Sequence, residues 1–68
     1  MAILKINGTD KNFDILPAAL TDLLVQMKID AATVVAEIDG RIIKRSDFAT
    51  EKICEGQKIE LIRLVGGG

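Results

Sequence analysis

One amphipathic helix stands alone in a chain whose other segments alternate apolar and polar residues in short runs. Leu20, Leu23, Leu24 and Met27 fall at positions i, i+3, i+4 and i+7, which predicts a helix over residues 19–28 with one apolar stripe. No other segment has a stripe long enough to cover a sheet. The helix must therefore cover one face of a sheet built by the other segments, and the predicted fold class is α+β.

Short alternating runs on both sides of this helix predict strands. The dipeptides Asn7-Gly8 and Asp39-Gly40 both tolerate the positive φ values of a tight hairpin turn. Gly56 predicts a further turn, and Ser46 is a candidate cap for a short helical turn. The predicted strands are residues 2–7, 11–15, 33–38, 41–45 and 58–65.

The last of these runs is the most apolar, which favours a central position in the sheet. An N-terminal hairpin, a crossing helix and a central last strand together make a β-grasp arrangement, with a mixed sheet of about five strands in the order ββαβββ. Residues 1–65 are predicted to form this domain and residues 66–68 a flexible tail. Alternation predicts that Leu4, Ile6, Ala36, Ile38, Ile59 and Leu61 face the helix, and that Lys5, Glu37 and Glu60 face solvent.

Composition excludes several classes of function. The chain has 68 residues, a formal net charge of -1, no histidine, one cysteine and two phenylalanines. It therefore lacks the basic surface of a nucleic-acid binder, the ligands of the usual metal sites, an internal disulfide and the base of a Ser-His or Cys-His pair. No apolar run reaches the ~20 residues of a membrane span, and no secretory signal is seen. We expect a cytoplasmic domain that is not an enzyme and binds no cofactor.

The residues Val65-Gly66-Gly67-Gly68 follow the most apolar strand directly. A glycine run at this position has two interpretations. It can be a frayed end, or it can be an arm that carries the Gly68 carboxylate into a narrow slot of a partner. A carboxylate is a poor electrophile, so a partner would first have to activate it, most simply as an acyl-adenylate.

The sequence resembles the ThiS family of ubiquitin-like sulfur carriers over essentially its whole length. The matching segments are ILKING, LTDLLVQMKID, VVAEIDGRIIKRSDF and EGQKIELIRLVGGG. The resemblance implies that a ThiF-like adenylating enzyme activates the Gly68 carboxylate with ATP, which belongs to that enzyme. A persulfide from a cysteine desulfurase or a rhodanese-type donor would then yield a thiocarboxylate. The thiazole synthase ThiG would take the sulfur from it.

Several other residues have a functional and an ordinary interpretation. Ile3, Val35, Ile62 and Leu64 share the face opposite the helix, and we expect them to form a docking patch beside the tail. Cys54 could hold a persulfide, but an inert, partly exposed thiol is preferred. The basic residues Arg41, Lys44 and Arg45 either protect a sheet edge, which is preferred, or steer the domain to an acidic partner.

Three other functions stay open at this point. A molybdopterin-synthase small subunit of the MoaD type would share the fold and the tail. A ubiquitin-like modifier would be conjugated to lysines through Gly68. A plain interaction module would use neither chemistry. In each case the free domain is expected to be a monomer.

Overall fold

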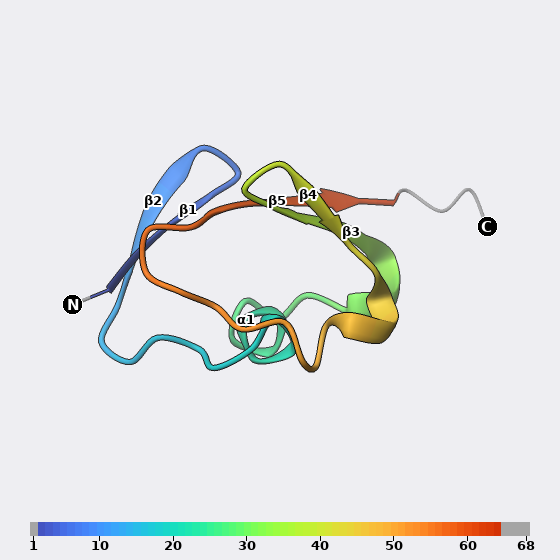
Figure 1. The fold of residues 1–68 in the computed structure, drawn as a ribbon, viewed down its shortest axis with the longest axis horizontal. Coiled ribbons are helices and arrows are strands. Elements are labelled where there is room, and N and C mark those ends of the chain that lie inside the picture. Colours follow the sequence, from blue (N-terminus) through green and yellow to red (C-terminus); the bar gives the residue numbers. More distant parts are fainter. Residues whose placement is uncertain (1, 65–68) are drawn as a thin grey trace.

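The computed structural model describes residues 2–64, which form a sheet with one α-helix beneath it (Figure 1). The strands lie in the order β2-β1-β5-β3-β4, and β5 is parallel to β1 but antiparallel to β3. The predicted mixed sheet of five strands with a central last strand is therefore confirmed. In chain order, the elements are β1 (Ala2–Ile6), β2 (Thr9–Phe13), α1 (Leu20–Gln26), the 3₁₀ helix η1 (Ala31–Thr33), β3 (Val34–Ile38), β4 (Arg41–Ile43), the 3₁₀ helix η2 (Arg45–Asp47) and β5 (Lys58–Arg63).

Both predicted hairpin turns form, and each has two successive residues in the left-handed region. The φ values are 50° and 82° in Asn7-Gly8, and 51° and 83° in Asp39-Gly40. Two positive φ values are typical of a type I′ turn, whose twist matches the flanking strands. Because the first loop has only two residues, Ile6 pairs with Thr9. The second strand thus begins at Thr9, and the predicted start at residue 11 is wrong.

The α-helix α1 is shorter than predicted and is closed at both ends by local hydrogen bonds. At its start, the Asp22 carboxylate accepts the backbone N–H of Ala19 at 3.0 Å, which satisfies one of the donors left free in a first turn. After its end, Lys28 adopts a φ of 58°, and the N–H of Ile29 reaches the carbonyl of Leu24 at 2.9 Å. This bond is typical of a Schellman motif, so Lys28 lies beyond the helix and not in its last turn.

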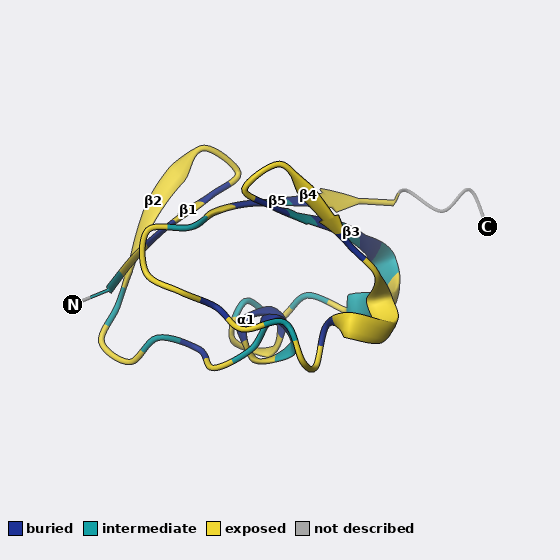
Figure 2. Ribbon diagram, in the orientation of Figure 1, coloured by how far each residue is buried: buried dark blue, intermediate teal, exposed yellow. Residues whose placement is uncertain are grey.

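The core lies between α1 and the sheet, and its residues follow the predicted alternation. All six strand residues expected to face the helix are buried (Figure 2). The core also includes Phe48 and Ile53, which come from segments without regular periodicity. The buried hydrophobic residues are Leu4, Ile6, Leu20, Leu23, Leu24, Val34, Ala36, Ile38, Ile43, Phe48, Ile53, Ile59 and Leu61.

The segment after the second hairpin departs from the prediction. β4 ends at Ile43 instead of continuing to residue 45, and the chain then turns into η2. Lys44 stands at the position before η2 and makes no capping hydrogen bond through its side chain, whereas Ser46 lies inside the turn. The prediction of Ser46 as a cap is therefore wrong. Within residues 2–64, no helix has the length and apolar character needed to cross a membrane.

Candidate functional site

An apolar patch forms on the outer face of the sheet, near the point where β5 ends. The register places Val35 of β3 directly opposite Ile62 of β5. Leu64 lies two residues further along the same face, and its N–H donates to the carbonyl of Thr33 at 2.6 Å. Ile62 and Leu64 are 53% and 50% exposed, respectively, which is unusual for large apolar side chains that lie next to each other. We call Val35, Ile62 and Leu64 the outer patch.

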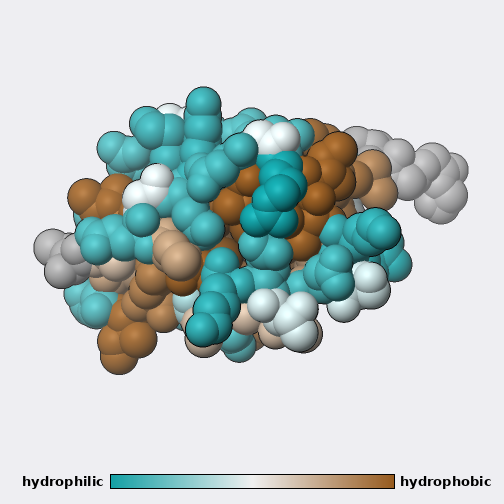
Figure 3. All heavy atoms as spheres, in the orientation of Figure 1, coloured by the Kyte–Doolittle hydropathy of each residue, from teal (hydrophilic) through white to brown (hydrophobic). Residues whose placement is uncertain are grey.

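Figure 3 shows hydrophobic atoms in two main places. One group lies on the β4 side, toward the end of the described chain, and the other lies at the lower left, below β1 and β2, while hydrophilic atoms cover most of the upper left. Ile42 of β4 adds to the exposed apolar surface at 67% exposure, on the same outer face. Sequence reasoning missed Ile42, because Ile42 and Ile43 are adjacent and alternation alone does not show which one faces the core.

Ile3 does not belong to the outer patch, although it lies on the same face of the sheet. The N–H of Gly56 donates to the carbonyl of Ile3 at 2.8 Å, so Ile3 lies beside the start of the segment that leads into β5. Gly56 precedes Ile62 by six positions, which corresponds to about 20 Å along an extended strand. The structure therefore corrects the prediction of one contiguous patch: three of the four residues come together, and Ile3 lies at the other end.

The predicted tail lies outside the described residues. This holds for Gly66 and Gly67 and for Gly68, the residue expected to be modified. Among residues 2–64, the sheet ladder extends to the backbone bond between Leu64 and Thr33. Leu64 is the last described residue before the glycine run. The outer patch therefore includes the residue at which the described chain ends.

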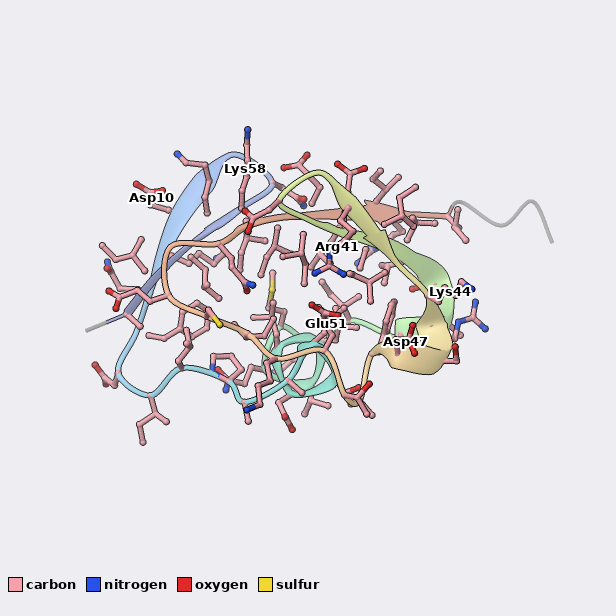
Figure 4. All side chains as sticks on the ribbon, in the orientation of Figure 1. Asp10, Arg41, Lys44, Asp47, Glu51 and Lys58 are labelled. Carbon is pink, nitrogen blue, oxygen red and sulfur yellow. The ribbon has the colours of Figure 1, made fainter. Side chains whose placement is uncertain are left out.

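The three basic residues of the second hairpin are not a free cluster. Arg41 forms an ion pair with Glu51 at 3.0 Å, and Figure 4 shows the two side chains pointing toward each other. Arg45 donates to the carbonyl of Ala32 at 3.3 Å. Lys44 is exposed. β4 is an edge strand, so Arg41 stands where a charged residue discourages pairing with another sheet.

Cys54 is exposed and lies in the irregular segment between η2 and β5. Its backbone N–H donates to the side-chain carbonyl of Gln57 at 2.9 Å, a bond that tightens the turn at Gly56. In residues 2–64 no group of three His, Cys, Asp or Glu side chains is placed to hold a metal ion. An open groove lies at the other end of the molecule, lined by Lys11, Asn12, Phe13, Asp14, Ile15, Gln26 and Met27.

The comparison with protein families covers nearly the whole chain. The model of the ThiS family matches residues 4–68. The chain belongs to the ThiS family. A solved structure of the thiamine biosynthesis protein ThiS from Geobacter metallireducens is 28% identical, with a TM-score of 0.84, over 97% of this chain and 99% of that chain. A solution structure of a thiamine biosynthesis protein from the same organism has a TM-score of 0.79 at 28% identity, over 100% and 88% of the two chains.

Two curated relatives carry functional names. The sulfur carrier protein ThiS of Bacillus subtilis is 27% identical over 97% of this chain and 100% of its own length. A thiazole synthase of Paramagnetospirillum magneticum is 33% identical over 96% of this chain, and the chain spans 20% of that protein's length. The ThiS resemblance and the β-grasp fold inferred from the sequence are thus confirmed. The family comprises small sulfur carriers of thiamin biosynthesis.

Proposed function

We propose that this protein carries sulfur for thiazole formation on the carboxylate of Gly68. The observation that carries the proposal is the family match, which extends through the glycine run to residue 68. In this reaction the Gly68 carboxylate attacks the α-phosphate of ATP held by a ThiF-like enzyme, and pyrophosphate leaves. A persulfide from a cysteine desulfurase or another donor then attacks the acyl carbon and AMP leaves. A second thiol of the donor cleaves the resulting acyl disulfide and releases the thiocarboxylate.

The chain's own contribution to this chemistry is a docking surface and a reacting end. The described residues contain no histidine, and their single cysteine is not needed as a nucleophile. Acid–base chemistry is therefore assigned to the partner, and the protein acts as a co-substrate. The outer patch supports this role, because it is an exposed apolar surface next to the residues that lead to Gly68.

We propose a thiazole synthase of the ThiG type as the acceptor of the sulfur. The similarity to one fifth of a thiazole synthase supports this assignment, because a carrier segment within the same polypeptide would deliver sulfur at high effective concentration. The reaction consumes ATP, and we propose the cytoplasm as its location.

Reconstitution followed by mass spectrometry tests the proposal. The protein is incubated with a ThiF-like enzyme, ATP and a persulfide donor, and its intact mass is measured. We expect a gain equal to the mass difference between sulfur and oxygen, located on Gly68 by fragmentation. Omission of ATP should abolish the gain. An unchanged mass, or a ladder of heavier protein adducts, would contradict the carrier function.

A further inference from the structure

Two glutamates lie directly opposite each other on the face of the sheet that α1 leaves uncovered. The register pairs Glu37 of β3 with Glu60 of β5. The backbone bond from Asp39 to Lys58, at 2.8 Å, fixes the phase of this antiparallel ladder. Hydrogen-bonded pairs recur every two residues along an antiparallel ladder, and Glu37 and Glu60 are each two residues from Asp39 and Lys58. They therefore form a hydrogen-bonded pair, with Cα atoms about 5.5 Å apart. Their side chains leave the sheet on the same side, about 5 Å apart at Cβ.

Within residues 2–64, neither glutamate takes part in an ion pair. The ion pairs of the described residues are Lys5 with Asp10 and Arg41 with Glu51. Lys58 lies on the same face, two residues before Glu60, and it makes no ion pair. Figure 4 shows Lys58 on the side of the sheet away from the helix. A like-charge pair directly across two strands lowers the stability of the free domain.

Apolar residues border the two carboxylates. The outer-patch pair Val35 and Ile62 lies next along the two strands, and Ile42 of β4 stands opposite Glu37 on its other side. Both glutamates are already half-buried. A partner that covers the outer patch would remove more water from the carboxylates, which costs free energy unless the partner also supplies a positive charge.

We propose that Glu37 and Glu60 form a receptor for an arginine of the adenylating enzyme that docks on the outer patch. This inference rests on the proposed function, which supplies that partner. A guanidinium is planar and has five N–H donors, so it can lie between two carboxylates and donate to both. It would relieve the repulsion between them at the moment of docking. The partner surface then presents an arginine beside an apolar area.

The negative charges of the two glutamates would lower the stability of the free domain and strengthen its binding to the adenylating enzyme. A merely structural role would move stability and binding in the same direction. Glu37→Gln and Glu60→Gln separate the two cases, because glutamine keeps the size of the side chain and removes its charge. Glu55→Gln is the matched control, since Glu55 is exposed and lies in the turn before β5.

The experiment measures urea unfolding of each free variant and its binding to the ThiF-like enzyme by calorimetry at low and high salt. We expect both Glu37→Gln and Glu60→Gln to raise the unfolding midpoint, to weaken binding at least about tenfold, and to flatten its salt dependence. Glu55→Gln should bind like the wild type. If the wild type is adenylated and the two variants bind as tightly as it does, the arginine receptor is wrong and the carrier function stands. If the wild type neither binds the enzyme nor is adenylated, both proposals fall.

Discussion

The side-chain Oδ1 of Asn7 accepts the backbone N–H of Leu61 at 2.7 Å, and so joins the first hairpin turn to the middle of β5. In a regular parallel ladder the backbone carbonyl of Asn7 would accept this bond. That carbonyl is turned away by the left-handed conformation of Asn7, and the side chain takes its place. Asp39 does the same on the other side of β5, where its Oδ1 accepts the N–H of Lys58 at 2.9 Å.

Substitutions of Asn7 should therefore lower the stability, and different substitutions should separate the loss of the hydrogen bond from the strain of the left-handed backbone. Asn7→Gly keeps the turn and leaves the N–H of Leu61 without its acceptor, for a loss of about 1–3 kcal/mol. Asn7→Ala adds the strain of a left-handed alanine, about 1 kcal/mol more. Asn7→Asp keeps an acceptor and should stay within about 1 kcal/mol of the wild type. Urea denaturation measures all three, and an unchanged Asn7→Gly would show that the bond to Leu61 contributes nothing.

The two faces of β5 should respond oppositely to the same polar substitution. Leu61 is 7% exposed and faces α1, whereas Ile62 is 53% exposed in the outer patch. Leu61→Gln buries an amide without a partner and removes apolar contact, for a loss of about 3 kcal/mol or more. Ile62→Gln should change stability by less than about 1 kcal/mol and weaken binding to the adenylating enzyme. Thermal unfolding and calorimetry test the pair; a stable Leu61→Gln variant would invert the assigned faces.

Cys54→Ser should leave thiocarboxylate formation nearly unchanged. The thiol is exposed, and the proposed acceptor of sulfur is the Gly68 carboxylate. The hydrogen bond from the backbone N–H of Cys54 to the side-chain carbonyl of Gln57 does not involve the thiol, so the turn should persist. The measurement is the yield of thiocarboxylate by mass spectrometry under the reconstitution conditions. A folded Cys54→Ser variant that accepts no sulfur would assign Cys54 a direct role.

Deleting Gly68 should nearly abolish adenylation. The carboxylate would stop up to about 3.5 Å short of the α-phosphate of ATP, and a displacement of about 1 Å can cost ~100-fold in rate. Docking through the outer patch should persist, because residues 2–64 are unchanged. Release of pyrophosphate measures the first effect and calorimetry the second. Normal pyrophosphate release from the truncated chain would mean that Gly68 is not the reacting residue.

The sequence was sufficient to predict the architecture because its strongest signals are local. The stripe from Leu20 to Met27 defines the helix, and Asn7-Gly8 and Asp39-Gly40 define the turns, since few residues accept positive φ at two successive positions. Alternation also assigned the faces of β5 correctly. Boundaries were less certain. The pattern of Phe13 and Ile15 suggested a strand to residue 15, yet Ile15 is 83% exposed and lies beyond β2.

Relationships between distant segments could not be predicted from local pattern. Alternation gave the face of Ile3 but not its position along the sheet, because the offset between the parallel strands β1 and β5 is set by the path of the chain between them. Alternation likewise gave the face of Glu37 and Glu60 but not their pairing, because the register between the antiparallel strands β3 and β5 depends on the long segment that joins them. Phe48 was also missed as a core residue, because it lies in a segment with no periodicity.

Since β1 and β5 run parallel, Ala2 and Arg63 lie at opposite ends of the sheet (Figure 1). A fluorescent dye, an affinity handle or a second domain joined ahead of Ala2 would be attached at the end of the sheet opposite the outer patch, and the length of the sheet would separate the two. A sensor surface that holds the protein by such a handle would therefore leave the outer patch, at the far end of the sheet, accessible to a partner in solution.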